Sequence, residues 1–528
     1  MTDYDLLITG GTVYDGSGAP GQVADVLITG DRIVEIGKLD GVQTRQTIDA
    51  SGKAVAPGFV DVHTHSDMAT LEVPLAEGRM LAGVTTDLMG HCGGSPFPLR
   101  GQVLQERKLA YADSPVELDW EDIEGYLKKA EAIGNSANRA VLVGHGTIRA
   151  AVMGYARRAP TSEELEQMKD EVRDALAHGA FGLSSGIAYP PGCYAENEEL
   201  IELCRVVAEA DGLYETHIRS EGERLIESVE DQFEVARQSG VRTQIAHLKV
   251  ARKPNWRKIG QLHDAFIRAR DQDGLDVTAD RYPYTASHTG LGAILPFWTH
   301  EGGSEATVGR LSSPETRARI REEVLRNYAN PEEWQGIVIS RVSSPERRDL
   351  EGLSVAEVAE KMDLEPVEAA FDLLIAEKMQ ISCVYHTMAE ENLRTILGWP
   401  FVMVGSDSRV RTADPDRRKD KPHPRAYGTS TRVLGKYVRE TGVLTVEQAV
   451  HKLSGQPAQR IGLENRGLLK KGFYADVTVF DPDTVIDRAT FEEPHQYPIG
   501  IEQVLVNGVV TVRNGKHTGA KAGRILKR

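Results

Sequence analysis

Histidines and a cysteine end two neighbouring apolar runs of the chain. "GFVDVHTH" ends with His63 and His65, which share one face of an extended strand because side chains alternate with period two. "VTTDLMGHC" ends with Cys92. Two imidazoles on one face can hold a cation, and a thiolate is a soft ligand that suits Zn²⁺. By residue type alone, Cys92 could also fill a core, form a disulfide or attack a substrate.

Three later apolar runs end in the same kinds of residue. They end at His217 in "LYETHIRSEG", His247 in "TQIAHLKV" and Asp407 in "VMVGSDS". A buried acid is costly unless it is paired, caps a helix or lies beside a metal. Either histidine alone is explained by a structural hydrogen bond, but together with His63 and His65 they indicate a metal centre. For His145 in "VLVGHGTIR" we expect a structural role, and we assign His91 none.

Such a centre requires elements that bring distant strand ends together. Apolar runs alternate with helical patterns such as "SEELEQMKDEVRDALAHG", which favours parallel βαβ units. Eight runs suit an α/β fold of the (β/α)₈ TIM-like barrel type, in which the carboxyl ends of all strands surround one mouth. A ninth run, "ISCVYH", has no place in this count. The eight are "GFVDVHTH", "VTTDLMGHC", "AVLVGHG", "FGLSSG", "LYETH", "RTQIAHLK", "DVTADRYPY" and "FVMVGSD".

Both ends of the chain differ from its middle. Short strand-like runs separated by glycine turns occur near the start, and "IEQVLVNGVVTVRNGK" near the end carries two hairpin signals. We expect residues 1–57 and 461–528 to build one small β-sandwich-like domain beside a barrel of residues 58–460. Residues 288–345 contain no clear barrel strand. This segment is expected to be a lid-like insertion between barrel strands 7 and 8.

Composition limits the classes of partner. The chain has 528 residues and a formal net charge of −16, which argues against nucleic acid and anionic membranes as partners. The acidic start does not resemble a signal peptide, and no apolar run is long enough to span a membrane. Only four cysteines occur, which disfavours a disulfide framework. We therefore expect a cytoplasmic protein. A homo-oligomer is compatible with the sequence.

Several motifs, in this order, resemble one known family. They are "APGFVDVHTHSD", "GVTTDLMGHCGGSP", "GLSSGIAYPPGCYA", "ETHIRSEG", "QIAHLK", "DRYPYTASHTGL", "GSDS" and "PHPRAYGT". Over nearly the whole chain they resemble the D-aminoacylase (N-acyl-D-amino-acid deacylase) branch of the amidohydrolase superfamily. That family has a metal-holding (β/α)₈ barrel and a small β-domain from both chain ends. These features agree with the pattern of the runs.

The resemblance implies a particular set of metal ligands. Cys92, His217 and His247 would make a tight zinc site. His63, His65 and Asp407 would make a second site that is weaker or empty. Cys92 would be able to bridge the two sites, in place of the carboxylated lysine that most amidohydrolases use.

The resemblance also implies zinc-dependent hydrolysis of N-acyl-D-amino acids. Zinc with three protein ligands lowers the pKa of its water to ~7, and the hydroxide would attack the amide carbonyl. Asp407 would act as general base and then general acid. The substrate carboxylate would contact Lys249, Tyr282 and Arg425, and Tyr189 would also touch the substrate.

Two departures from the family pattern stand near these residues. His288 occupies a position where the family usually has a serine that contacts the carboxylate. The segment from Asp407 to Arg425 is longer and more charged than usual, which puts the assignment of Arg425 in doubt.

The apolar stretch "GAILPFWTHEGG" favours hydrophobic substrate side chains over acidic ones.

Two other functions remain open at this point. One is a different amidohydrolase, such as a hydantoinase or dihydroorotase-type cyclic amidase, although those enzymes generally carry the bridging lysine. The other is a catalytically inactive barrel that binds a metal or a ligand. In either case the expected partner is a small molecule.

Overall fold

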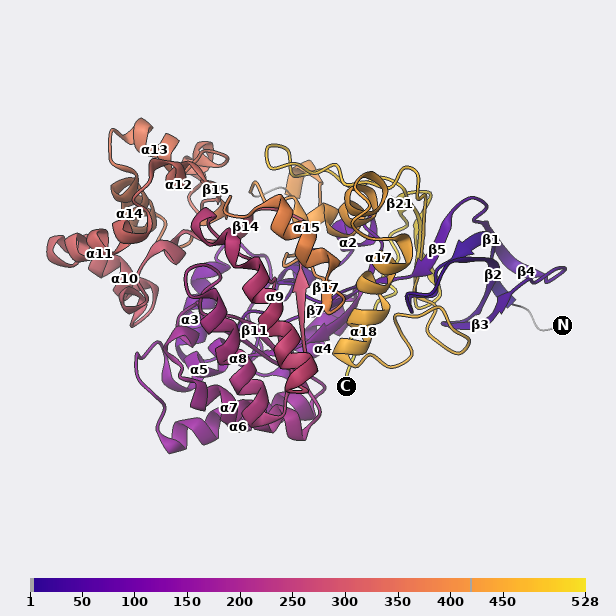
Figure 1. Ribbon diagram of the computed structural model, residues 1–528, viewed down its shortest axis with the longest axis horizontal. Coiled ribbons are helices and arrows are strands. Elements are labelled where there is room, and N and C mark those ends of the chain that lie inside the picture. The colour runs from indigo at the N-terminus through magenta and orange to yellow at the C-terminus, as the bar shows by residue number, and fades with distance from the viewer. Residues whose placement is uncertain (1–3, 418–419) are drawn as a thin grey trace.

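The computed structural model describes residues 4–417 and 420–528, and its middle is an α/β arrangement of parallel strands (Figure 1). In the described residues these strands form a sheet with the order β17-β13-β12-β11-β10-β9 and another with the order β6-β7-β8. This confirms the predicted α/β class with parallel sheets. The strands are β6 (Phe59–Asp61), β7 (Val84–Met89), β8 (Asn138–Val141), β9 (Val143–Gly144), β10 (Gly182–Gly186), β11 (Leu213–His217), β12 (Arg242–Ile245), β13 (Val277–Arg281) and β17 (Val402–Val404).

The two parallel sheets meet at both of their edges. Only Leu142 separates β8 from β9, so the third apolar run supplies a strand to each sheet. At the other edge, Thr64 and Ser408 form a parallel bridge, and the amide of Asp407 donates to the carbonyl of His63 at 2.8 Å. Each of the eight apolar runs therefore contributes to one continuous succession of parallel strands.

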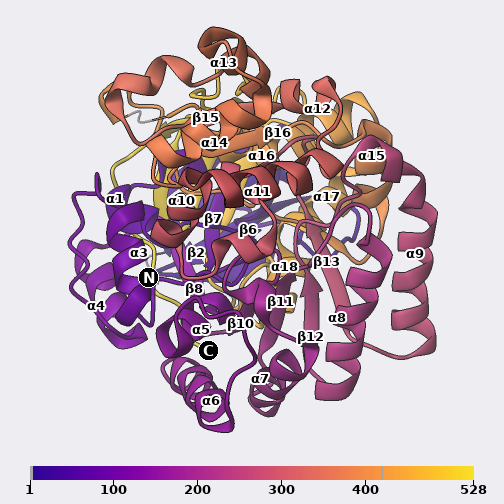
Figure 2. The same cartoon turned by 90° about the vertical axis from the view of Figure 1, so that its left-hand side faces the viewer.

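Helices surround these strands, as Figure 2 shows for α5 to α9. The strands β7, β10 and β11 are buried along their whole length, as expected for parallel strands covered on both faces. Helix α6 begins with a capping box at Thr161, and α7 buries Leu200, Leu203, Cys204 and Val207, which recur at helical spacing. The helices are α1 (Ala69–Glu72), α2 (Glu77–Met80), α3 (Gly101–Ala110), α4 (Ile123–Ile133), α5 (His145–Met153), α6 (Ser162–Ala177), α7 (Asn197–Glu209), α8 (Leu225–Ser239), α9 (Ile259–Ile267), α15 (Glu390–Gly398), α16 (Arg425–Arg432), α17 (Val446–Leu453) and α18 (Gly455–Ile461).

Strands from both ends of the chain share one sheet, which lies at the right of Figure 1. Antiparallel pairing of β5 with β18 joins the two ends, and Val55 and Val477 pack in the same apolar core. The sheet order is β21-β20-β19-β18-β5-β1-β2-β3, with β4 paired to β1. Its strands are β1 (Tyr4–Val13), β2 (Gln22–Thr29), β3 (Arg32–Gly37), β4 (Thr44–Asp49), β5 (Ala54–Pro57), β18 (Val477–Phe480), β19 (Ile501–Val506), β20 (Val509–Arg513) and β21 (Lys516–His517).

A segment with its own core follows β13 and lies at the upper left of Figure 1. It contains an antiparallel sheet with the order β14-β16-β15. The segment runs to Tyr385, beyond the expected boundary at residue 345, because the unplaced run "ISCVYH" forms the central strand of that sheet. Its elements are β14 (Ser287–Gly290), α10 (Ser304–Ser312), α11 (Pro314–Asn327), α12 (Pro331–Gln335), β15 (Ile337–Arg341), α13 (Val355–Met362), α14 (Pro366–Ala376) and β16 (Ser382–Tyr385).

Polar contacts fasten this inserted segment to helix α3 and to the segment that follows β10. Ser304 donates its hydroxyl to Glu106 at 2.7 Å, and Tyr194 donates to the carbonyl of Phe297 at 2.9 Å. The segment therefore covers the end of the parallel strands where the predicted ligands lie. Among residues 4–417 and 420–528, no helix combines the length and apolar character that a membrane span requires.

Candidate metal centre and substrate cavity

Three of the predicted ligands share an unusual backbone conformation just beyond their strands. Cys92 follows β7, His247 follows β12 and Asp407 follows β17, and their φ angles are 53°, 35° and 51°. Non-glycine residues rarely adopt this left-handed region, and those that do gather at functional sites. The chain thus turns sharply at the same point beyond three separate strands.

Glycines make the turn at Cys92 possible. Gly93 has a φ of +76° and packs against the backbone of Gly186, where a Cβ on Gly186 would lie 2.0 Å from the carbonyl oxygen of Cys92. A side chain at Gly186 would therefore collide with the strand end that carries the cysteine. The glycines after Cys92 let the backbone leave the centre directly.

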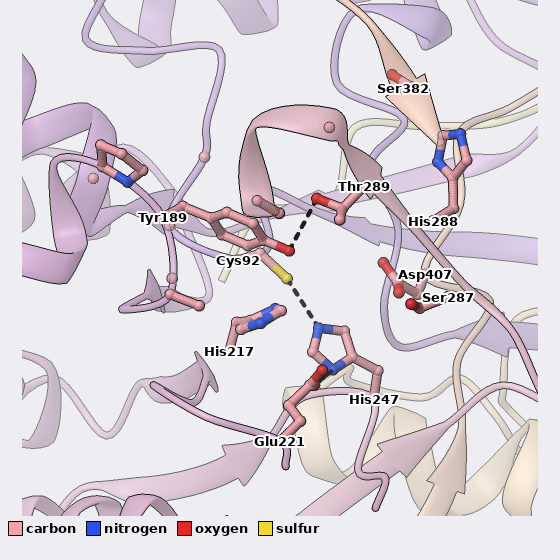
Figure 3. A pocket seen from close by; sticks show the side chains of 18 of the residues that line it. Cys92, Tyr189, His217, Glu221, His247, Ser287, His288, Thr289, Ser382 and Asp407 are labelled. Atoms are coloured by element: carbon pink, nitrogen blue, oxygen red, sulfur yellow. Dashed lines mark hydrogen bonds and ion pairs between the residues drawn. The ribbon is translucent and has the colours of Figure 1, made fainter. Parts of the chain in front are cut away.

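The predicted ligand atoms converge. The Sγ of Cys92 lies 3.5 Å from Nε2 of His63 and 3.6 Å from Nε2 of His247, and Figure 3 shows it directed at His247. The Oδ1 of Asp407 lies 3.0 Å from Nε2 of His65 and 3.5 Å from Nε2 of His63. Groups whose ligand atoms all lie within 4.8 Å of one another are His63–Cys92–His247, His63–His65–Asp407, His217–Glu221–His247 and His63–His91–Glu215.

His217 lies in this centre beside His247. Their ring centroids lie 4.3 Å apart at nearly right angles, and the group that contains His217 includes Glu221 rather than Cys92. All six residues predicted to bind metal therefore lie in one place, while the division into a tight and a weaker site stays a prediction. Glu221 was not predicted, since nothing in its spacing separates it from Glu223, the other acid of "IRSEGER".

The charge states of these residues suit a bound cation. Burial lowers the pKa of both His63 and His217 well below the usual range, so both rings are neutral and keep a lone pair for a metal. Within the described ranges, Nδ1 of buried His217 has no hydrogen-bond partner. Burial also raises the pKa of the Cys92 thiol, and Glu215 raises it further, so a thiolate here requires a cation. The donor set of sulfur and imidazole nitrogen fits Zn²⁺.

Carboxylates behind the histidines orient their rings. Oδ1 of Asp280 lies 3.0 Å from Nδ1 of His63. Nδ1 of His247 lies 2.9 Å from Oε1 of Glu221 and 2.8 Å from Nζ of Lys249. In both rings this leaves Nε2 facing the sulfur of Cys92. Such contacts fix the tautomer of a ligating histidine and raise its basicity.

A second buried acid lies behind Cys92. Glu215 accepts a hydrogen bond from the amide of Cys92 at 3.3 Å, and burial raises its pKa to about 8. His91 stacks on His63 with ring centroids 4.3 Å apart, so it packs behind the centre. His145 lies elsewhere, with Nε2 at 2.7 Å from Glu199 in a buried ion-pair network. This contact agrees with the structural role expected for His145.

The centre opens into a cavity of about 1770 Å³ beneath the inserted segment. Of the residues predicted to contact substrate, Tyr189, Lys249, His288 and Arg425 line this cavity. Tyr282 does not line it. Its ring lies 4.6 Å from the guanidinium of Arg425, so it supports that side chain from behind.

Both predicted carboxylate-binding cations already have acidic partners. Arg425 donates to Oδ2 of Asp407 at 2.7 Å, and Lys249 forms an ion pair with Glu221. Burial raises the pKa of Asp407, but Arg425 and His247 outweigh it and hold that pKa well below the usual range. The longer segment after Asp407 therefore still returns Arg425 to the centre, at the start of α16.

Comparison with known proteins gives the wider context of this centre. The sequence model of the Amidohydrolase family matches residues 46–512, most of the chain. The chain belongs to the amidohydrolase family. D-aminoacylase of Alcaligenes xylosoxydans xylosoxydans is 36% identical over 535 aligned residues, which cover 99% of this chain and 98% of the relative. N-acyl-D-glutamate deacylase of the same organism is 37% identical over 526 residues, with coverage of 99% and 96%.

Solved structures of other amidohydrolases agree with this amidohydrolase in fold. N-acyl-D-glutamate deacylase from Bordetella bronchiseptica, complexed with zinc and a phosphonate inhibitor, superposes with a TM-score of 0.83. It is 35% identical, and the match covers all of both chains. A structure of D-aminoacylase gives the same TM-score at 34% identity, covering 99% of this chain and 100% of the other.

The Glu221 carboxylate provides a test of the centre that does not depend on turnover. Replacement E221Q removes the charge that accepts from His247, so zinc affinity is expected to fall by about 10- to 100-fold. Competition with a chromogenic chelator measures this affinity. The control is E223Q, an exposed glutamate two residues on, which should bind zinc as the natural protein does. Equal zinc affinity in both variants would show that Glu221 does not support metal binding.

Proposed function

We propose that this amidohydrolase hydrolyses the amide bond of N-acyl-D-amino acids to a carboxylate and a free D-amino acid. One observation carries the proposal. The sulfur of Cys92 faces two imidazoles beside an ionised Asp407, which is held by Arg425 at the floor of a large cavity. The relatives that match along the full chain are named as deacylases of this kind, which supports the assignment.

The metal proposed for this centre is zinc, held tightly by Cys92, His217 and His247. A second site that is weaker or empty would use His63, His65 and Asp407. When bound, zinc would supply Lewis acidity toward the amide carbonyl and lower the pKa of water at the centre. The neutral imidazoles and the buried sulfur support this donor set.

Asp407 moves the proton in the proposed reaction. Its Oδ2 is held by Arg425, and its Oδ1 faces His65 and His63. The carboxylate takes a proton from the attacking water and later delivers it to the leaving amine nitrogen. Arg425 keeps the carboxylate ionised and fixes its orientation, so Asp407 is ready to accept the proton when substrate arrives.

Cations near the centre hold the substrate carboxylate in this proposal. Lys249 and Arg425 attract it, and Tyr282 stabilises Arg425 through its ring. Tyr189 stands opposite, where its hydroxyl accepts a hydrogen bond from Thr289 at 3.2 Å and its ring lies against His217. His288 replaces the usual serine, and its carbonyl accepts a hydrogen bond from Arg425 at 3.5 Å.

We further propose that the D-amino-acid side chain is hydrophobic. Ala293, Ile294, Leu295, Pro296 and Phe297 all line the cavity, and they give one wall an apolar surface. The named relatives differ in side chain, since one is called a D-glutamate and another a D-aspartate deacylase. Their names therefore do not decide this preference.

The arrangement proposed around the site has two parts. The parallel strands of residues 58–460 would close into a single (β/α)₈ barrel, as the continuity through Leu142 and the Thr64–Ser408 bridge suggest. Residues 1–57 and 461–528 would form the small β-domain.

All four cysteines lie in the described ranges without a disulfide, which supports a reducing compartment such as the cytoplasm.

A substrate panel tests the proposed function. The zinc-loaded protein is given N-acetyl, N-formyl and longer-chain acyl derivatives of D- and L-amino acids, together with hydantoin and dihydroorotate. Hydrolysis is expected for the acyl-D-amino acids and for neither cyclic amide. Activity on a cyclic amide alone would replace the proposal with a cyclic amidase. A zinc-loaded protein inert toward the whole panel would indicate a binding barrel.

A further inference from the structure

One wall of the cavity carries cations that the proposed reaction does not use. It is built from the longer segment after Asp407 and from two strands of the inserted segment, β14 and the end of β15. We call it the arginine wall, and its residues are His288, Arg341, Arg409, Arg411 and Asp420, all of which line the cavity.

Hydrogen bonds hold the segments of the arginine wall together. The amide of Lys421 donates to the carbonyl of Ser340 at 2.9 Å, and the hydroxyl of Ser340 donates back to the carbonyl of Lys421 at 2.8 Å. Nε2 of His288 lies 3.0 Å from the same hydroxyl. The longer segment and the inserted segment are therefore joined beside His288, so the two departures from the family pattern lie next to each other.

The charges on this wall do not balance. Arg411 is neutralised by Asp420 at 2.8 Å. In the described part of the chain, the guanidinium groups of Arg341 and Arg409 have no ion-pair partner and no hydrogen bond to an acceptor. Arg409 is exposed and lines the cavity, with the Tyr111 ring 5.9 Å from its guanidinium carbon. Asp420 also attracts Arg341 and Arg409, but in the described residues no carboxylate lies within ion-pair distance of either guanidinium group.

The other charged groups near the wall do not remove this excess. Burial lowers the pKa of His288 to about 3, and Arg425, Arg411 and Arg409 lower it too, so the imidazole is neutral. Asp67 and Glu72 approach Arg409, and Glu351 approaches Arg341, but none lies within ion-pair distance. Burial raises the pKa of Asp67 and of Glu351, which weakens both as counter-ions.

We propose that the arginine wall binds a second carboxylate of the substrate, separate from the one next to the amide. The inference rests on the proposed function and names a narrower substrate class for it. Guanidinium groups are weakly hydrated and match carboxylates with two parallel hydrogen bonds, so Arg341 and Arg409 suit this ligand. Arg425 and Lys249, which contact Asp407 and Glu221 at the centre, serve the carboxylate next to the amide.

Two kinds of substrate carry such a carboxylate. One has a dicarboxylic acyl group with its free acid at the far end, which is compatible with a hydrophobic D side chain. The other has an acidic D side chain, as named for two relatives. That side chain conflicts with the hydrophobic preference proposed above, so the dicarboxylic acyl group is the source that we expect. Each can be compared with a neutral amide of the same shape, so the pairs N-succinyl-D-leucine with N-succinamoyl-D-leucine and N-acetyl-D-glutamate with N-acetyl-D-glutamine separate the two sources.

The test measures kcat/KM for both pairs in the natural protein and in R341Q and R409Q. We expect N-succinyl-D-leucine to be favoured over N-succinamoyl-D-leucine by about 10-fold or more, because a charged hydrogen bond contributes more than about 1.4 kcal/mol. Each variant should remove most of that preference and leave N-acetyl-D-leucine unaffected. The control is R224Q, a cavity-lining arginine outside the arginine wall, which should keep the preference.

The outcomes separate this inference from the proposed function. Turnover of N-acetyl-D-leucine with no preference for charge in either pair would overturn the arginine wall as a carboxylate site and leave the deacylase intact. If no acyl-D-amino acid is hydrolysed, the proposed function fails. In that case calorimetric binding of N-succinyl-D-leucine and N-acetyl-D-glutamate decides the question. Weaker binding of either one to R409Q supports the wall, and equal affinities for both overturn it.

Discussion

C92A is expected to lose tight zinc and to lower kcat by roughly a thousandfold, since a catalytic metal contributes several kcal/mol to the transition state. The reason lies in the position of the sulfur. It is 3.5 Å from His63 and 3.6 Å from His247, and burial raises its pKa so strongly that only a cation can keep it ionised. Removing it leaves neutral imidazoles without the anionic ligand that neutralises zinc.

Two measurements check the C92A prediction. Metal analysis after dialysis counts zinc per chain, and steady-state kinetics with N-acetyl-D-leucine gives kcat. C204A is the matched control, because Cys204 is also a buried free cysteine but lies on α7, where it packs in the apolar core. C204A should keep its zinc. Full retention of zinc by C92A would show that Cys92 is not a zinc ligand.

D407N is expected to keep its zinc and to lose turnover by about 10²- to 10⁴-fold, the usual contribution of a general acid or base. An amide at this position cannot accept the proton from water, although it still fits beside His65. Because Arg425 holds the carboxylate ionised, the natural residue is in its basic form over the whole working range of pH.

The same substitution has a consequence for stability that depends on pH. The pKa of Asp407 in the folded chain lies well below its ordinary value of 3.8. The ionised group therefore stabilises the fold above pH 3.8, and this contribution is lost as the pH falls below that value. The difference in melting temperature between the natural protein and D407N should shrink in that acid range.

The control for D407N is D414N, an exposed aspartate on the same longer segment. It should match the natural protein in zinc content and kcat. Near-normal turnover of D407N would contradict the proton-transfer role of Asp407, and loss of zinc from D407N would assign the carboxylate to the metal instead.

The strand ends were the part of the site that sequence could predict. An apolar run that stops at a histidine, cysteine or aspartate is a local signal, and His63, Cys92, His217, His247 and Asp407 each carry it. The class of fold followed from the alternation of these runs with helices. Parallel strands then bring their carboxyl ends together whatever the lengths of the loops between them.

The supporting carboxylates could not be predicted in this way. Asp280 contacts His63 across 217 residues of sequence, and Glu221 follows its strand in a loop that carries a second glutamate, Glu223. Their roles depend on three-dimensional distances that no periodicity encodes. The place of "ISCVYH" in the inserted segment could not be predicted for a related reason. Its central strand β16 pairs with β14 and β15 far earlier in the chain, so "ISCVYH" had no partner visible along the sequence.

The most direct test of the proposed function is the stereochemistry of the released amino acid. The zinc-loaded protein is incubated with racemic N-acetylleucine, and the free leucine is resolved by chiral chromatography. We predict release of D-leucine in at least about 100-fold excess over L-leucine, since a site built around a fixed carboxylate and amide rejects the mirror image. Release of L-leucine in equal or greater amount would contradict the account.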